Sequence, residues 1–272
     1  MPSHSSSSAP HSAPNSAARA VPLVGPPNCD IAFVFALGIE SGCLEDRFTG
    51  SSVVHAAGRR VRVGQLAGHR IALIRTGMGQ TAARRGTEHL LAGHRPRLVI
   101  SAGFSGGLHP DVRRGDLVLA DRVGLSSGER LLVDLRFEQN NSARPRVHVG
   151  SIVTVDQLVC LPAEKLALGR QHGALAVDME SWAVADACRQ AKVPFLAVRV
   201  ISDAADEALP AFIDQMARRK GFAGKTGVVL GALWRRPGNL REMVRLRSEG
   251  LVQADRLARF LVQLVGQIAP AA

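Results

Sequence analysis

The chain has 272 residues, of which 46% are hydrophobic, so it is long enough to bury one large core. Its net charge is +11, but the basic residues are mostly arginines spread along the chain, and aromatic residues make up only 4%, with no tyrosine. Surfaces that bind nucleic acid by base stacking need aromatic side chains, so no nucleic-acid partner is expected. No segment approaches the roughly 20 consecutive apolar residues of a membrane-spanning helix, so stable membrane insertion is not expected either.

Cysteine and histidine are scattered rather than clustered. The four cysteines form no CxxC pair, and the nine histidines form no HExxH motif. The sequence therefore predicts no metal site and no cofactor. Free thiols are typical of a reducing compartment, which indicates the cytoplasm.

The first 28 residues differ in composition from the rest. Residues 1–28 are dominated by Ser, Ala and Pro without apolar periodicity, which is typical of a disordered extension. They lack the basic start and apolar run of a signal peptide. Residues 29–272 are predicted to form one folded domain that ends in an amphipathic helix.

Taken in chain order, strand-length apolar runs alternate with helical patterns. Strands are predicted at 30–37, 60–66, 70–75, 98–102, 116–123, 147–155 and 194–201, and helices at 80–92, 163–171, 178–191 and 240–268. Residues 67–69 are predicted to turn a hairpin. The alternation predicts an α/β fold with a mixed, largely parallel twisted sheet flanked by helices. In such sheets ligands bind beyond the carboxyl ends of the strands.

Three carboxylate positions are candidates for chemistry. Glu40 follows the first predicted strand and is placed to activate a water molecule, although an acid in the first turn of a helix is also explained by the helix dipole. Asp178 and Glu180 open a predicted helix, where they either complement its dipole or accept hydrogen bonds from a ribose diol. Asp203 ends the most apolar strand and is either a helix N-cap or a proton donor to a leaving group.

Two glycine-rich segments interrupt the pattern, at 77–79 and 103–107. Glycine is needed where a backbone turns sharply or approaches a ligand closely. Neither segment matches a phosphate-binding P-loop or a dinucleotide fingerprint. Both are therefore predicted to be loops beside a site, without a nucleotide-phosphate motif.

In this order the pieces resemble the purine/uridine phosphorylase superfamily, and most closely its methylthioadenosine/S-adenosylhomocysteine nucleosidase branch. The segments that carry the resemblance are ALGIE at 36–40, TGMG at 76–79, AGFSGGL at 102–108, AVDME at 176–180 and VRVISDAAD at 198–206. The last two are the most specific. The resemblance implies a nucleoside phosphorylase-like fold and hydrolysis of the N-glycosidic bond of an adenine nucleoside in nucleoside catabolism and methionine salvage, by a cytoplasmic homodimer.

The resemblance also implies a role for each matching residue. Glu40 would hold the attacking water, and Asp203 would protonate the departing adenine, with Ser202 orienting the base. The residues implied to bind substrate are Gly79, Gly103, Phe104, Leu158, Met179, Glu180, Arg199 and Ser202, with Arg199 supporting Glu180. Phe104 stands where a serine is usual in the family, and Leu158 where an aromatic residue stacks on adenine.

The sequence leaves two candidates for the nucleophile, water and phosphate. The amino-terminal part of the chain has no Gly-Asp-Pro-x-Arg phosphate loop, and the Glu40 carboxylate would repel an anion, so water is favoured. The alternative is a phosphorylase that releases adenine from a lipid-linked nucleoside, because 204–210 and 235–240 resemble hopanoid-associated adenosyl phosphorylases. The apolar segment 222–234 would suit such a substrate, or a packed helix or dimer interface.

Overall fold

The computed structural model describes residues 29–56, 58–133, 146–210 and 240–268. The extension predicted at 1–28 and the segment 222–239 lie outside these ranges. The described elements are β1 (Cys29–Phe35), α1 (Gly38–Glu45), β2 (Thr49–Ala56), β3 (Arg59–Leu66), β4 (His69–Arg75), α2 (Gln80–His94), β5 (Pro96–Gly107), β6 (Leu117–Leu125), β7 (Arg130–Leu132), β8 (Val147–Thr154), α3 (Pro162–His172), β9 (Ala174–Asp178), α4 (Ser181–Ala191), β10 (Phe195–Asp203) and α7 (Leu240–Gln267).

All of these strands belong to one ten-stranded sheet, part of which closes on itself. The strand order is β10-β6-β8-β9-β5-β1-β4-β3-β2, with β7 beside β6, and β10 also pairs with β5. Strands β5, β9, β8, β6 and β10 therefore form a closed ring, and β1, β4, β3 and β2 extend from β5 as an open arm. The sheet is mixed, as predicted: β1 is parallel to β4 and β5, and β10 is parallel to β5, whereas β10 is antiparallel to β6.

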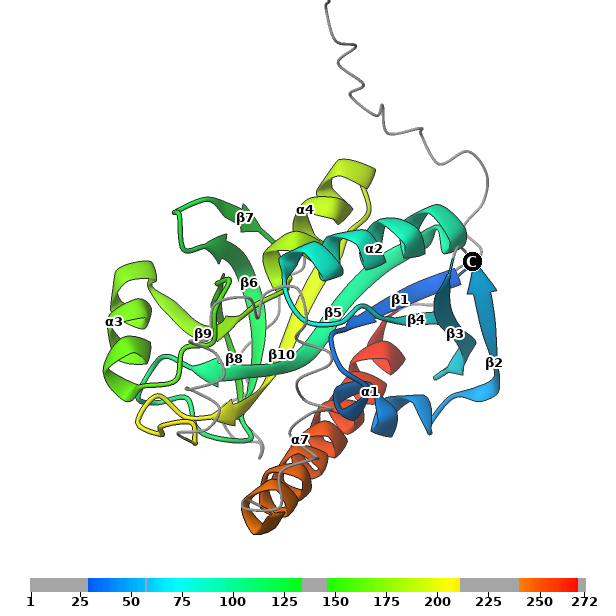
Figure 1. Cartoon of the computed structure of the whole chain (residues 1–272). Helices are drawn as coiled ribbons and strands as arrows, with labels where there is room; N and C mark the ends of the chain where they lie inside the picture. Colours follow the sequence, from blue (N-terminus) through cyan, green and yellow to red (C-terminus); the bar gives the residue numbers. More distant parts are fainter. Residues whose placement is uncertain (1–28, 57, 134–145, 211–239, 269–272) are drawn as a thin grey trace, which may run out of the picture.

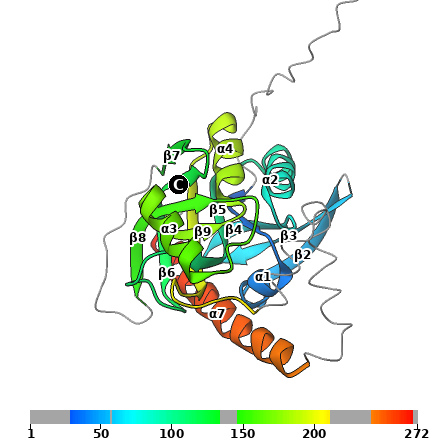
Figure 2. The ribbon, with the colours of Figure 1, turned by 60° about the vertical axis from the view of Figure 1, so that its left-hand side comes forward.

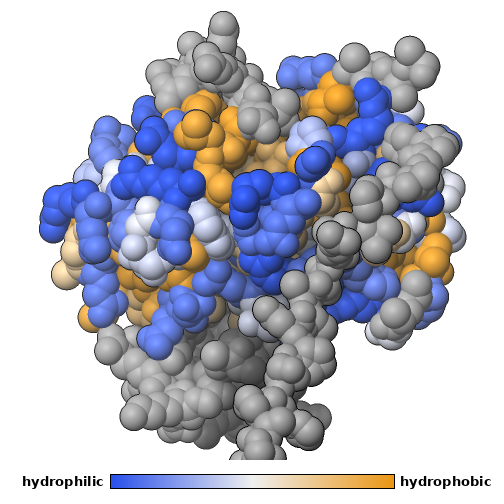
Figure 3. All heavy atoms as spheres, turned by 90° about the horizontal axis from the view of Figure 1, so that it is seen from above, coloured by the Kyte–Doolittle hydropathy of each residue, from blue (hydrophilic) through white to orange (hydrophobic). Residues whose placement is uncertain are grey.

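Helices cover both faces of the sheet (Figure 1). Helices α2 and α4 pack together on one face, and α1 and α7 pack together on the other. Figure 2 shows α7 running beneath the body of the molecule and projecting beyond it. On the side of α2 and α4, polar residues surround smaller apolar patches (Figure 3). Strands β1, β4, β5 and β10 contribute a large share of the central core because both of their faces are covered.

The predicted hairpin is confirmed. Strands β3 and β4 are antiparallel, with Leu66 opposite His69. Between them, Ala67 and Gly68 have φ values of 48° and 84°. Positive φ at both central positions is the geometry of a type I′ turn, whose twist matches that of the flanking strands.

The structure corrects two boundaries. Residues 103–107 continue β5 rather than forming a loop, because β10 pairs with them on one side and β9 pairs with Gly106 and Gly107 on the other. Asp178 ends β9, and the helix that was predicted from this residue begins at Ser181. Strands β2, β7 and β9 were not predicted from the sequence, and a helix at the position of α1 was only an alternative explanation for Glu40.

Candidate active site

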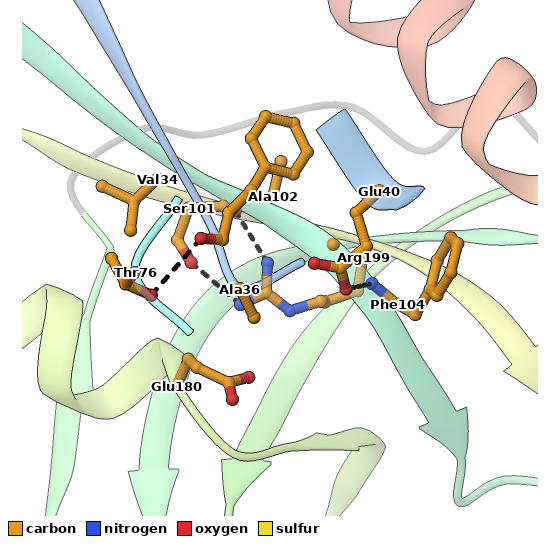
Figure 4. Close-up of a pocket in the computed structure, with 11 residues that line it drawn as sticks. Val34, Ala36, Glu40, Thr76, Ser101, Ala102, Phe104, Glu180 and Arg199 are labelled. Atoms are coloured by element: carbon orange, nitrogen blue, oxygen red, sulfur yellow. Dashed lines mark hydrogen bonds between the residues drawn. The ribbon is translucent and has the colours of Figure 1, made fainter. Parts of the chain in front are cut away.

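A pocket opens where the ends of β1, β4, β5 and β10 meet the start of α1 (Figure 4). Its position agrees with the rule that ligands bind beyond the carboxyl ends of strands in such sheets. The lining residues are Val34, Phe35, Ala36, Glu40, Thr76, Ser101, Ala102, Gly103, Phe104, Glu180 and Arg199. Two carboxylates and one guanidinium thus meet in a setting that is otherwise apolar or uncharged.

Glu40 is buried at the first turn of α1, with 5% of its surface exposed. One carboxylate oxygen accepts a hydrogen bond from Leu37 N at 2.7 Å, and the other accepts one from Phe104 N at 2.9 Å. Burial raises the pKa of Glu40, and the two backbone N–H groups oppose that rise. Glu40 therefore caps its own helix and also faces the pocket, and its role in activating water stays a prediction. Each oxygen keeps a second lone pair for a water molecule.

Glu180 faces the pocket from the turn between β9 and α4. Gly79 N donates a hydrogen bond of 2.6 Å to its Oε1 atom, which links the end of β4 to the start of α4. Burial raises the pKa of Glu180 to about 8, and the negative charges of Asp178 and Glu40 add to the rise. Near neutral pH its carboxyl group can therefore both donate and accept hydrogen bonds, which suits a pair of ribose hydroxyls.

Arg199 pairs with Asp178 and not with Glu180, which corrects the partner that the resemblance implied. Its Nε atom donates to Asp178 Oδ2 at 2.9 Å, and both side chains are almost completely buried. Its Nη atoms donate to Ser101 and Ser181, and to the carbonyl of Val198. The guanidinium thus joins β5, β9, β10 and α4, and its positive charge acts on Glu180 only through space.

Gly103 explains why β5 can pass so close to Glu40. A Cβ atom at this position would lie 2.7 Å from Glu40 Oε1, which is closer than real Cβ contacts allow. A larger residue here would displace the Glu40 carboxylate, so the glycine is explained by the close approach of that carboxylate to the strand and not by a loop. Phe104 follows directly, and its backbone N–H holds Glu40.

Asp203 lies further along β10 and has a partner that the sequence analysis missed. Strand pairing sets Arg199 opposite Gly103 and Asp203 opposite Gly106. Ser202 Oγ donates to Asp203 Oδ1 at 2.6 Å, and the Nζ atom of the completely buried Lys165 binds Asp203 Oδ2. The Asp203 side chain is thus held by a hydroxyl and an ammonium group.

The structure brings five of the ten expected site residues into the pocket lining: Glu40, Gly103, Phe104, Glu180 and Arg199. Gly79 lies beside the pocket through its bond to Glu180. Met179 directly precedes the lining residue Glu180, and Ser202 and Asp203 follow Arg199 on β10, but none of the three lines the pocket. Leu158 is 41% exposed on the loop after β8. The expected roles of these residues remain predictions. Thr76 was missed although it begins the TGMG segment, and Ser101 and Lys165 were missed because nothing in their local sequence separates them from ordinary strand and helix residues.

Within the described ranges, no group of three or more His, Cys, Asp or Glu side chains is placed to hold a metal ion. No described helix is long and apolar enough to span a membrane. The alternative involving a lipid-linked nucleoside rests on residues 204–210, which are described, and on residues 222–240, of which 222–239 lie outside the described part of the chain.

Comparison with known proteins agrees with the fold. A family model described as the phosphorylase superfamily matches residues 30–226. The chain therefore belongs to the phosphorylase superfamily. Two curated relatives are 5'-methylthioadenosine/S-adenosylhomocysteine nucleosidases: the protein from Tolumonas auensis is 30% identical over 68% of this chain and 90% of its own length. The protein from Bacillus thuringiensis is 31% identical over 69% of this chain and 93% of its own length.

Solved structures support the same fold. The 5'-methylthioadenosine/S-adenosylhomocysteine nucleosidase from Neisseria meningitidis, in complex with methylthio-immucillin-A, superposes with a TM-score of 0.64 at 23% identity, over 88% of this chain and 99% of that one. The S-adenosylhomocysteine nucleosidase from Streptococcus pyogenes gives 0.67 at 17% identity, over 89% and 98%. The predicted nucleoside phosphorylase-like α/β fold is confirmed.

Proposed function

We propose that the chain hydrolyses the N-glycosidic bond of an adenine nucleoside of the methylthioadenosine/S-adenosylhomocysteine type and releases adenine. The names of the curated relatives support this reaction and this substrate class. The pocket supports it independently, because a buried carboxylate at the end of a strand is suited to activate water near an anomeric carbon.

The proposed mechanism assigns one step to each carboxyl group. Glu40 accepts a proton from the attacking water, and Glu180 holds the ribose hydroxyls with its position fixed by Gly79 N. The bond between the anomeric carbon and the base breaks with its electron pair going to the base. Asp203 protonates a ring nitrogen of adenine, and Ser202 orients the base. Cleavage of this kind passes through an oxocarbenium-like state, which a general acid and a general base stabilise from opposite sides.

Water is favoured over phosphate as the nucleophile because the hydrogen-bond donors of Arg199 are already used within the protein. It is the only cationic side chain among the residues that line the pocket. All three of its nitrogens already donate hydrogen bonds within the protein, to Asp178, two serines and two backbone carbonyls. A phosphate nucleophile needs cationic or N–H partners, whereas the Glu40 carboxylate, which must be ionised to accept a proton from water, would repel an anion.

The test is adenine release from methylthioadenosine, measured in phosphate-free buffer and again with phosphate. Equal turnover in both buffers, with free methylthioribose as product, is the expected result. Turnover that requires phosphate would contradict the hydrolytic assignment. Absence of turnover on methylthioadenosine and on S-adenosylhomocysteine in both buffers would contradict the proposed substrate class.

We further propose that residues 29–272 form the catalytic domain, that residues 1–28 are not needed for turnover, and that the enzyme is a cytoplasmic homodimer. Exposed leucines on β7 and on the loop before α3 are available for contact with a second copy: Leu132 is 81% exposed, and Leu158 and Leu161 are 41% exposed. All four cysteines are free, which suits a reducing compartment. Light scattering on the full chain and on a chain lacking residues 1–28 tests the dimer, and an activity assay on both tests the extension.

A further inference from the structure

Lys165 is a charged residue in a position that normally holds an apolar one. It lies on α3, a helix on which only Lys165 and Gly169 are buried, and none of its surface is exposed. The desolvation of a buried ammonium group is so costly that an apolar side chain of similar size is often at least as stable. The position of Lys165 is therefore better explained by what its ammonium group does than by packing.

The ammonium group directs all of its N–H donors to the segment that follows β10. It binds Asp203 Oδ2, and it donates to the carbonyl oxygens of Ala204 at 3.0 Å and Glu207 at 2.7 Å. Three N–H groups thus fix the carboxyl group of Asp203 and the backbone on its carboxyl side. No donor is left for a ligand, so Lys165 can act on the reaction only through Asp203.

The other charged groups in this region already have partners. The Glu207 carboxylate accepts from Arg114 Nη2 at 2.7 Å and from Ala204 N at 2.9 Å, and the Arg114 bonds hold the pKa of Glu207 below its usual value despite its burial. Arg114 also pairs with Glu249 of α7. Asp203 is therefore the one side-chain carboxylate bound to Lys165, and Ser202 occupies its second oxygen.

We infer that Lys165 is a positioning residue for Asp203 and holds the proton that Asp203 passes to the departing base. This inference rests on the proposed function. As the glycosidic bond breaks, the ring nitrogen takes a proton from the Asp203 carboxyl group, and Lys165 gives one N–H proton to Asp203 and becomes a neutral amine. The proton of the attacking water goes to Glu40. Glu40 afterwards releases that proton to solvent, and solvent returns one proton to Lys165. Charge and protons balance without any further reactant.

Two substitutions of Lys165 separate this role from a purely structural one. K165M has similar length without charge, and K165R keeps the charge but holds its proton too tightly to release it. Both are compared with the parent on methylthioadenosine and on the nitrophenyl glycoside of methylthioribose, whose nitrophenolate leaves without a proton. Cleavage of the nitrophenyl glycoside also shows that a variant is folded.

At about pH 8, K165M is expected to lose roughly 100-fold or more in kcat/KM on methylthioadenosine, the contribution typical of a general acid. Its kcat/KM on the nitrophenyl glycoside is expected to stay near that of the parent. The loss is expected to shrink as the pH falls, because an isolated carboxyl group takes its proton from solvent only in the acid range. K165R is expected to show most of the same loss of kcat/KM on methylthioadenosine.

Three results would overturn the inference: unchanged activity of K165M on methylthioadenosine, equal loss on both substrates at every pH, or full recovery in K165R. Each would reduce Lys165 to a structural or purely electrostatic role. If the parent itself cleaves neither substrate, the proposed function fails, and this outcome is distinct from a failure in the variants alone.

Discussion

Glu40 has an environment in which protonation and function are directly linked. Its buried carboxylate has a raised pKa, and it must be ionised to take a proton from water. The activity is therefore expected to fall on the acid side at a higher pH than an ordinary glutamate would give. A pH profile of kcat/KM measures the pH at which activity falls on the acid side. A fall at or below about pH 4.5, the range of an unperturbed glutamate, would contradict this expectation.

The variant E40Q keeps the size of this side chain and removes its basicity. Its kcat is expected to fall about 10²- to 10⁴-fold, which is the usual contribution of a general base. Nucleoside binding is expected to persist, because the pocket keeps its shape. Steady-state kinetics together with calorimetric titration of a nucleoside analogue check the two expectations, and turnover at the parent rate would place water activation elsewhere.

At Asp203 a single substitution changes stability as well as chemistry. D203N leaves the Lys165 ammonium group buried beside a neutral amide, and removal of one partner from a buried ion pair typically costs about 3–5 kcal/mol. D203N combined with K165M removes both charges. The double variant is expected to be more stable than D203N while remaining as inactive on methylthioadenosine. Chemical denaturation and activity assays check this pair, and a double variant no more stable than D203N would disprove the energetic argument.

The sequence, through its resemblance to a known family, indicated several residues that line the pocket. Glu40, Glu180 and Arg199 were found from the sequence and meet in one pocket. The partner of Arg199 could not be predicted, because Asp178 and Glu180 are only two residues apart in the sequence. The position at which β9 ends sets Asp178 against Arg199 and leaves Glu180 facing the pocket. Lys165 was missed because its contact with Asp203 joins residues 38 positions apart, and no local pattern records it.

Among the elements, Arg199 ties the ring strands to a helix. Its side chain bonds β5 through Ser101, the end of β9 through Asp178, and α4 through Ser181. R199M is expected to lower the free energy of unfolding by about 3–5 kcal/mol, because it leaves the Asp178 carboxylate buried without its cation.

The control for R199M is R84M, which breaks a more exposed ion pair between α2 and α4. A change of no more than about 1 kcal/mol is expected there. Chemical denaturation of the parent and both variants makes the comparison. Equal losses in R199M and R84M would show that Arg199 does not hold these elements together.

Elements with strong local patterns were predicted well, and elements defined by their neighbours were not. The hairpin of β3 and β4 and the long α7 follow from turn residues and apolar spacing. The last five residues of β5 contain three glycines, so their sequence indicates a loop, and they are a strand only because β10 and β9 pair with them. Strand propensity depends on such pairing more than on the residue itself.

At the scale of the molecule, the pocket carboxylates make stability depend on pH. The pKa of Glu180 is raised to about 8 and that of Glu40 is also raised, so the folded chain binds more protons than the unfolded chain above about pH 4.5. Their contribution to stability is complete at acid pH and is lost as the pH rises through their folded pKa values.

The free energy of unfolding is therefore expected to fall between about pH 5 and pH 8 in the parent, and to fall less in E40Q and E180Q. Lowered pKa values at Asp30, Asp186 and Asp255 act in the opposite direction, but at lower pH. Denaturant titrations at several pH values check the slope. An identical slope in parent and variants would show that these two carboxyl groups do not control it.

The closure of the strand ring also dictates when a growing chain can complete its fold during synthesis. Strand β10 begins at Phe195 and pairs with both β5 and β6, although these strands are synthesised about a hundred residues earlier. Until β10 has left the ribosome, the edge of β5 from Val99 to Ser105 has no neighbour on that side. Exposed strand edges invite pairing with other chains. Chains stalled before residue 195 are therefore expected to depend on chaperones, whereas the hairpin of β3 and β4 can form early.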